Sequence, residues 1–273
     1  MISLNRFEGF VIVSDFDGTL TGTDGIIPEK NIEAIKYFIR RGGRFTVSTG
    51  RTYKGFHNYS PEIINAPVLL GNGADAFDYL ENKSIFSNAV EADSISVIES
   101  IVSAFPQIAV EFFSCDKNSY VLNPNEQSFR HFKGLRIDDY KIADSISESM
   151  FPAVKIMLSV NEKTFEVQEF LRTIDLGKIK YIPCTGSYVE LLSKEAGKGK
   201  ALHQLSDHLG IPFGNIFAVG DGSNDVDMLS EAVNSFCPSG ADALALSAAK
   251  EILCSSDDGV VAHLISVIEE KFI

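Results

Sequence analysis

Two aspartates stand where this chain could do chemistry, in the segment Asp15-Phe16-Asp17-Gly18-Thr19. The run before them, residues 10–14, is short, apolar and partly β-branched, which predicts a buried strand of a mostly parallel sheet. Open α/β sheets bind ligands at the carboxyl ends of their strands. Side chains two residues apart on a strand point the same way. We therefore expect two adjacent carboxylates at a ligand site, where their repulsion requires a cation, a shared proton, or both.

Such a pair suits a nucleophilic carboxylate beside a carboxylic acid, with a hard divalent metal in front of them. Asp15 is the expected nucleophile, because its ionised carboxylate could attack a phosphoryl group and form an aspartyl-phosphate that water then cleaves. Asp17 is the expected general acid and base, since the leaving oxygen needs a proton and the hydrolytic water must lose one. The alternative is two acids in a solvated turn.

Three further segments follow in chain order. Ser48-Thr49-Gly50-Arg51 comes after a strand-like run at 44–47. Gly197-Lys198-Gly199-Lys200 opens a helical pattern, and Gly220-Asp221-Gly222-Ser223-Asn224-Asp225 follows a strand-like run at 216–219. Strand ends and a helix start with these residue types could together hold a phosphate and a metal ion.

Together the four segments resemble those of the haloacid dehalogenase superfamily of phosphohydrolases, specifically its Cof-type branch with a type-IIB cap. The resemblance covers nearly the whole chain. It implies an α/β fold with a Rossmann-like parallel-sheet core and an inserted α+β cap domain. It also implies action on phosphate esters, because the dehalogenases proper lack the second aspartate, which is present here as Asp17.

The same resemblance implies Mg²⁺ as the cofactor, held by Asp15, Asp221 and the backbone carbonyl of Asp17. Oxygen ligands suit this hard cation. Asn224 and Asp225 could bind the metal directly, or orient its waters and Lys198. An acidic helix start without any such role is the alternative for Asp225.

The resemblance assigns the substrate phosphate to Thr49, Gly50, Lys198 and Asn224. Thr49 would hydrogen-bond a phosphoryl oxygen while Gly50 permits close backbone approach, and Ser48 is the alternative by one position. With Asp15 and Asp17, Thr49 and Lys198 complete the expected catalytic set.

Lys198 fits better than the neighbouring Lys194 and Lys200. Glycines flank it, and a predicted helix begins there, so that both its ammonium and the helix N-terminus favour an anionic phosphate. Lys200 is expected on the helix surface.

Other polar residues have weaker assignments. In the inserted region, Arg130, His131, Lys133 and Lys155 are possible substrate contacts, although solvated charge is the preferred interpretation of each. The segment 237–241 departs from the asparagine–alanine pair usual in the family, which leaves its role open.

His203 and His208 lie in a predicted helix and are expected on its surface. Asn72 resembles a family segment near the site, although an Asn-Gly pair is also a turn signal. Arg51 could reach substrate or the cap, or could be an exposed arginine at a helix start.

The pattern of expected strands, helices and connections changes along the chain and predicts its domains: core at 1–79, inserted α+β cap at 80–187, and core again at 188–273. Strands that alternate with helices favour a parallel sheet in the core. The longer polar connections of the insertion, such as residues 123–126, favour an antiparallel sheet there. We also expect a helix near 53–59.

The stretch Tyr188–Leu192 is expected to return the chain to the core.

The 273 residues carry a formal net charge of −13, which argues against nucleic acid or an anionic membrane surface as a partner. The four cysteines lack metal-binding spacing and are expected to be free and reduced. Without a recognisable signal peptide or membrane span, a cytoplasmic protein is predicted.

The favoured function is Mg²⁺-dependent hydrolysis of small phosphorylated metabolites, sugar phosphates above all, by a monomer or homodimer. A large cap would exclude macromolecules and water. One alternative is a phosphomutase, since phosphomannomutases share this cap type. Another is a non-catalytic metabolite-binding regulatory protein, against which the presence of both Asp15 and Asp17 argues.

Overall fold

The computed structural model describes residues 5–160, 163–183 and 186–273. The chain forms two compact units, which we name the core and the insert. The core contains the chain up to Gly50, Asn58–Phe86 and Gly197–Ile273, and the insert contains Arg51–His57 and Ser87–Ala196. The insert thus begins and ends later than residues 80–187 and takes in a short additional segment.

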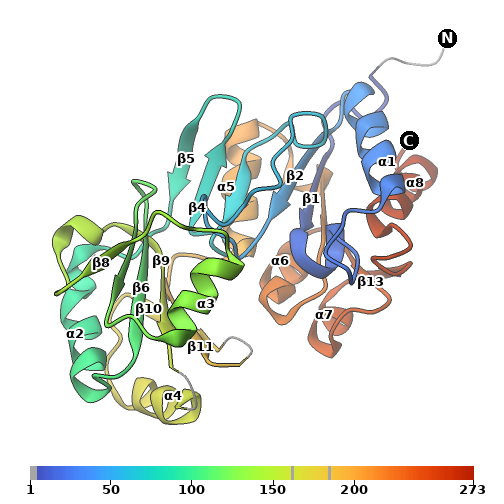
Figure 1. Ribbon diagram of the computed structural model, residues 1–273. Coiled ribbons are helices and arrows are strands. Elements are labelled where there is room, and N and C mark those ends of the chain that lie inside the picture. The colour runs from blue at the N-terminus through green and yellow to red at the C-terminus, as the bar shows by residue number, and fades with distance from the viewer. Residues whose placement is uncertain (1–4, 161–162, 184–185) are drawn as a thin grey trace. The chain divides into compact units, whose positions relative to one another are not determined.

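The core is built on an eight-stranded sheet (Figure 1). Its strands, in order across the sheet, are β14 (Glu251–Leu253), β13 (Asn234–Pro238), β12 (Ile216–Val219), β1 (Val11–Asp15), β2 (Arg44–Ser48), β3 (Val68–Leu70), β4 (Asp75–Asp78) and β5 (Lys83–Ser87). All pairs from β14 to β3 are parallel, and β3 pairs with β4 in the antiparallel sense.

Helices flank the core sheet. They are α1 (Glu29–Arg40), α5 (Lys198–Leu209), α6 (Val226–Glu231), α7 (Ala243–Ala248) and α8 (Val260–Lys271). α1 and α8 lie side by side (Figure 1), and α5 lies against α6. Val11 and Val13 of β1 pack with Leu202 of α5 and Met228 of α6. Because helices cover a parallel sheet in this way, β1 is buried along its whole length, and its sequence is apolar from Val11 to Val13 before the buried Ser14 and Asp15.

β1 ends at Asp15, and Phe16–Leu20 form a tight turn. Asp17 therefore does not continue the strand. The Asp15 side chain is buried, whereas that of Asp17 is exposed. The strand period, from which the sequence analysis expected the two carboxylates to point the same way, therefore ends at Asp15 and does not extend to Asp17.

In its described residues, the insert contains a six-stranded sheet and three α-helices. The strands, in order, are β10 (Ile179–Pro183), β11 (Tyr188–Ser193), β9 (Ala153–Ser159), β6 (Ala109–Ser114), β7 (Ser119–Leu122) and β8 (Lys141–Ala143). The helices are α2 (Ile95–Ala104), α3 (Glu126–Gly134) and α4 (Thr164–Thr173). Neighbouring strands are antiparallel except β7 and β8, which are parallel.

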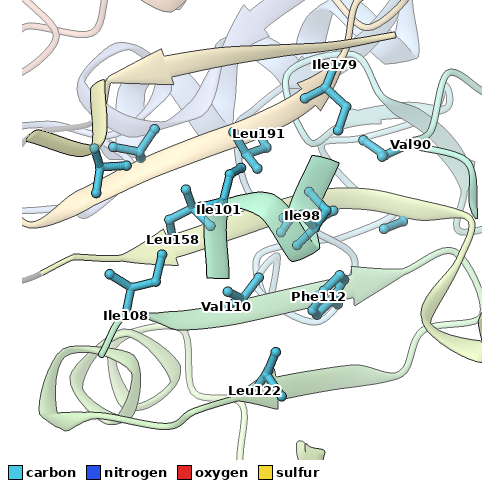
Figure 2. Packing of buried hydrophobic residues seen from close by; sticks show 14 of the residues in the cluster. Val90, Ile98, Ile101, Ile108, Val110, Phe112, Leu122, Leu158, Ile179 and Leu191 are labelled. Carbon is cyan, nitrogen blue, oxygen red and sulfur yellow. The ribbon is translucent and has the colours of Figure 1, made fainter. Parts of the chain in front are cut away.

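The two faces of the insert sheet carry different side chains. One face forms an apolar cluster with α2, in which Ile98 and Ile101 pack against Val110, Phe112 and strand neighbours (Figure 2). Alternate residues of the same strands point to the opposite face, as the two-residue period of a strand requires. There α3 contributes the buried side chain of Phe132.

Two sequence expectations fail at the level of single elements. Residues 53–59 form a turn at 53–55 followed by irregular chain instead of a helix, with Lys54 paired to Asp139 at 2.6 Å and His57 Nε2 in contact with the Leu135 carbonyl at 2.9 Å. These contacts fix the segment within the insert without a ladder of helical hydrogen bonds.

The second failure concerns Tyr188–Leu192, which does not return to the core sheet. The strand β11 pairs with β9 and β10, because its short, largely apolar sequence fits either sheet and does not encode the partner. The polar connection expected at 123–126 is present but short: residues 123–125 join β7 to α3, which begins at Glu126. Asn125 caps this helix, exchanging hydrogen bonds of 3.0 Å with Ser128 in both directions.

Among the described residues, no helix has the length and apolar character needed to cross a membrane.

Candidate active site

Polar residues follow the carboxyl ends of four neighbouring strands in the core sheet. Asp15 ends β1, Thr49 follows β2, Asn72 lies two residues after β3, and Asp221 lies two residues after β12. These strands are parallel neighbours, so their carboxyl ends meet at the same edge of the sheet. The candidate site is therefore assembled from segments far apart in the sequence.

Lys198 is buried between two of the carboxylates. Its Nζ donates hydrogen bonds of 2.5 Å to Asp15 Oδ1 and 2.5 Å to Asp225 Oδ1. The Lys198 side chain is 0% exposed, and those of Asp15 and Asp225 are 8% and 1% exposed. Charge-assisted hydrogen bonds of this kind hold the lysine in one position.

The start of α5 positions Lys198, its first residue. The turn after β3 packs directly against this helix start. Gly73 has φ +84°, and a Cβ there would lie 2.2 Å from the Gly197 carbonyl oxygen. A side chain at residue 73 would therefore displace the backbone from which Lys198 projects.

Asp225 uses both carboxylate oxygens inside the site. Oδ1 accepts from Lys198, and Oδ2 accepts from the backbone N–H groups of Asp221 (3.1 Å) and Gly222 (2.9 Å). One side chain thereby fixes both the lysine and the loop that presents Asp221.

Asp221 is held from the opposite side by the turn after β1. Thr19 Oγ1 donates a short hydrogen bond to Asp221 Oδ1. Gly18, with φ +83°, lies so close that a Cβ would come within 2.7 Å of Asp221 Oδ2. The glycine is needed both for its left-handed backbone and for this approach. Thr19 had no expected role, although its place two residues after Asp17 in the turn was a usable signal.

Burial and mutual charge shift the protonation of these groups in opposite senses. Burial raises the pKa of Asp15, and the Lys198 ammonium opposes that shift. Burial lowers the pKa of Lys198, but Asp15 and Asp225 outweigh it, so that its pKa is raised overall and the lysine stays charged. Burial also raises the pKa of Asp221, against the hydrogen bond from Thr19. Three carboxylates thus share one ammonium, and the cluster favours additional positive charge.

Asp15, Asp221 and Asp225 each offer a carboxylate oxygen within 4.8 Å of the others. An all-oxygen donor set with excess negative charge fits a hard divalent cation. Both carboxylate oxygens of Asp225 already accept hydrogen bonds, from Lys198 and from two backbone amides, so Asp15 and Asp221 are the better metal ligands. The exposed Asp17 carboxylate is not part of this group. Its backbone carbonyl as a ligand stays a prediction.

The predicted phosphate-binding residues surround the same sheet edge. Thr49 is 1% exposed, and its backbone N–H donates to the Leu69 carbonyl at 2.9 Å. Asn224 donates from Nδ2 to Asn72 Oδ1 at 3.2 Å, which links the loop after β12 to the loop after β3. A Cβ at Gly50 would lie 3.2 Å from the Asn72 amide, so Gly50 permits a close approach there.

Ser48 and Thr49 remain two candidates for one role. Ser48 is fully buried and, among the described residues, its Oγ has no hydrogen-bond partner. Ser48 lies opposite Asp15 in the register of β1 and β2.

Several polar residues lie apart from the cluster. Lys194 and Lys200 are exposed. His203 is exposed, pairs with Glu231 at 3.0 Å and stacks on Phe213, and His208 is exposed as expected. Arg51 belongs to the insert, where it donates to the Gly55 carbonyl at 3.4 Å.

The segment 237–241 connects β13 to α7. The backbone N–H of Asp242, which caps α7, donates to the Asp221 carbonyl at 2.8 Å. The departure from the usual family pattern thus leaves a loop that supports Asp221 by its backbone. The sequence analysis gave Asp242 no role.

Two insert residues expected to be solvated lie against buried carboxylates instead, His131 half-buried and Lys155 buried. His131 Nδ1 makes a short contact with Glu111 Oε2, and Glu111 is 0% exposed. Lys155, only 7% exposed in its side chain, pairs with Glu190 at 3.5 Å. The solvated-charge interpretation of His131 and Lys155 is wrong, because each lies beside a buried carboxylate on the insert sheet. Arg130 and Lys133 are exposed, as expected.

A parallel sheet with acids and a lysine at its carboxyl edge, interrupted by an α+β insert, defines an α/β enzyme with a preformed polar site. The match to a known family is specific: the model of the haloacid dehalogenase-like hydrolases covers residues 12–265. The chain belongs to this family, and it is a hydrolase with the Rossmann-like core and inserted α+β unit described above.

Known proteins are similar over almost the entire chain. The 5-amino-6-(5-phospho-D-ribitylamino)uracil phosphatase YbjI of Escherichia coli is 25% identical over 266 residues, which cover 96% of this chain and 97% of that protein. The crystal structure of TM0651 from Thermotoga maritima has a TM-score of 0.82 and 22% identity, covering 95% and 97%. The HAD subclass IIB sugar phosphatase BT4131 has a TM-score of 0.79 and 20% identity, covering 96% and 98%.

Proposed function

We propose that this protein is a Mg²⁺-dependent phosphatase that hydrolyses small phosphorylated metabolites, in particular sugar phosphates, through an aspartyl-phosphate on Asp15. The observation that carries the proposal is the buried cluster in which Lys198 bridges Asp15 and Asp225 beside Asp221. The phosphatase activity of the similar E. coli protein and the sugar phosphatase among the similar structures support the same choice.

In the first half-reaction, a carboxylate oxygen of Asp15 attacks phosphorus, and the bond from phosphorus to the leaving oxygen breaks. Asp17 gives its proton to that oxygen, and its exposed position in the turn after β1 leaves it accessible to a leaving group. In the second, water attacks the aspartyl-phosphate, Asp17 takes a proton from the water, and inorganic phosphate leaves with the Asp15 carboxylate restored.

Lys198 stabilises the charge that develops on the phosphoryl oxygens. An ammonium has three N–H donors, and Asp15 and Asp225 accept two of them. The third is the natural donor to a phosphoryl oxygen at Asp15, in a buried setting where such a hydrogen bond counts most. Thr49 or Ser48, the Gly50 backbone and Asn224 supply neutral donors around the same oxygens.

Asp15, Asp221 and the carbonyl of Asp17 would hold Mg²⁺, with Asp225 and Asn224 orienting their surroundings. When bound, the ion would neutralise the excess carboxylate charge and polarise the phosphoryl group. This addition of positive charge is what allows an anionic substrate to approach a protein of net charge −13.

The test is release of inorganic phosphate from a panel of sugar phosphates, nucleotides and a phosphopeptide, with Mg²⁺ and with excess chelator. We expect turnover of small esters with Mg²⁺, loss with chelator, and poor support by Ca²⁺, which prefers more ligands at longer distances. Asp15→Asn protein purified in parallel controls for contaminating phosphatases. Full activity in chelator would overturn the metal assignment. A shifted phosphate on recovered sugar phosphate would indicate a phosphomutase instead.

A further inference from the structure

A cavity of about 480 Å³ is lined by insert residues alone. Two segments form walls of the cavity. Ser87–Glu91 lies where the chain passes from the core into the insert, and Ser193–Glu195 lies just before the chain passes back into the core at Gly197. Gly177 and Lys178, just before β10, complete the lining together with Ser94. The volume falls in the range of roughly 300–1,000 Å³ that small-molecule pockets occupy.

Backbone hydrogen bonds order these walls. Val90 exchanges two with Ala153 of β9, at 2.8 and 2.9 Å, and Lys194 N donates to the Lys178 carbonyl at 2.8 Å. Lys178 Nζ in turn pairs with Asp93 at 2.6 Å, which connects the loop before β10 to the segment before α2. The cavity is therefore a preformed feature of the insert.

The lining has a mixed chemistry without excess positive charge. Lys178 is already paired with Asp93, and the remaining charged lining residues are Lys194, Glu91 and Glu195. A phosphate-bearing ligand is therefore disfavoured, because these groups would not neutralise its charge in a chain of net charge −13.

Neutral polar groups and a small apolar surface complete the lining. The side chains of Ser94 and Ser193 are buried, at 5% and 6% exposed, and Ala89 and Val90 are buried as well. Carboxylates accept hydrogen bonds from ligand hydroxyls, ammonium groups donate to them, and serine hydroxyls do both. The aliphatic surface can pack against C–H groups of the same ligand.

We propose that this cavity binds a neutral polyhydroxylated molecule of about monosaccharide size. Such an occupant contacts two of the four connections between the insert and the core at once, so that binding restricts the backbone of both segments. This site is independent of the proposed phosphatase chemistry, because it uses none of the residues around Lys198.

The test uses the full-length protein and glucose, mannose and xylitol as probes, with glycine and inorganic phosphate as zwitterionic and anionic comparisons. Calorimetric titration and hydrogen exchange are measured on the wild type and two variants. Lys194→Glu reverses one charge of the cavity lining, and Lys133→Glu makes the same charge change at an exposed position on α3 outside the lining. Asp15→Asn protein controls for sugar bound as a product at the core site.

We expect saturable binding of at least one of the three polyols, weakened at least tenfold by Lys194→Glu and unchanged in Lys133→Glu and Asp15→Asn. Hydrogen exchange should slow at 87–91 and 193–195 when that polyol is bound. Absence of saturable binding by all three polyols overturns the proposal, as does binding that Lys194→Glu leaves intact or Asp15→Asn removes. Preferential binding of glycine or phosphate overturns the ligand class.

Discussion

Both units bury carboxylates beside basic side chains, but they balance the charge differently. In the core, Lys198 pairs with Asp15 and Asp225, and Asp221 has a carboxylate oxygen within 4.8 Å of theirs, so that in the described part of the cluster three carboxylates lie beside one ammonium. In the insert, Glu190 has Lys155 as its partner. Burying an unbalanced charge is expensive, so a cluster that retains one is more plausibly kept for chemistry than for stability.

The second buried carboxylate of the insert is also matched. Glu111 accepts from Ser159 Oγ at 2.6 Å and contacts His131 on its other oxygen. Its hydrogen-bonding capacity is thus met by neighbours on the same sheet and on α3. The contrast predicts that substitutions in the core cluster change turnover most, whereas those in the insert cluster change stability most.

Asp15→Asn should have the largest effect on turnover, a loss of about 10⁴-fold or more, which is typical when a nucleophile is removed. The amide is nearly isosteric and removes a negative charge from an over-charged cluster, so the melting temperature should stay within a few degrees of wild type. Phosphate release and thermal melting are measured on the same preparation. Near-wild-type turnover in a folded variant would exclude the covalent mechanism.

Lys198→Ala should lower turnover by about 10²–10³-fold, the usual cost of losing one donor to a developing charge in a closed site. It should also destabilise the fold by about 3–5 kcal/mol, because two buried carboxylates lose their common partner. Activity is therefore assayed well below the measured melting temperature. Lys200→Ala, two residues along α5 and exposed, is the matched control and should be nearly silent. Equal losses in the two variants would show that the position of the phosphate-binding lysine is misassigned.

Glu111→Gln, in the insert, should lower stability more than turnover, the opposite of what is expected for Asp15→Asn in the core. The new amide places a donor among groups that already donate, which should destabilise the protein by about 1–3 kcal/mol. Turnover by the folded protein should fall much less than in Lys198→Ala. Denaturant unfolding measures the change, with Glu99→Gln at an exposed position of α2 as the control. If Glu111→Gln lost turnover at unchanged stability, Glu111 would have a role in catalysis, and the proposed difference between the core and insert clusters would be wrong.

Asp257→Asn should have the smallest effect. Asp257 Oδ1 accepts hydrogen bonds from Thr23 N (2.7 Å) and Thr23 Oγ1 (3.1 Å), and so fixes the loop that follows the turn carrying Asp17. Loss of one exposed interaction of this type costs about 0.5–1.5 kcal/mol, and turnover should fall less than tenfold. Asp207→Asn, exposed on α5, is the comparison. A loss of turnover as large as that of Lys198→Ala would show that the loop fixed by Asp257 takes part in catalysis.

The sequence predicted the parallel core sheet because short, largely apolar strands such as β1 alternate with helices and end in polar residues. It also predicted the segments that meet at the sheet edge, and Asp225 as a residue that could orient Lys198. It did not predict where β1 ends relative to Asp17, since the two-residue period holds only while the strand continues. Nor did it predict that Thr19 donates to Asp221, or that Asp225 accepts from the backbone of the loop carrying Asp221, because such contacts depend on loop geometry.

The insert was less predictable for a physical reason. The short, largely apolar sequence of β11 indicates a strand, and the strand is buried on both faces, but the sequence does not indicate which sheet it joins. Likewise, a lysine or histidine in a sequence is solvated by default, and only the neighbouring strands reveal that Lys155 and His131 lie beside buried glutamates.

The position of β1 in the core sheet has a consequence for how the protein is made. β1 lies between β2, which follows it closely in the chain, and β12, which comes from the last quarter of the sequence. During synthesis, one edge of β1 therefore stays unpaired until most of the chain, including β12, has been made. Strand pairs between segments so far apart in sequence form slowly. The same waiting period applies to Lys198 and Asp221, so the nascent protein carries its nucleophile long before it carries the groups that would activate it.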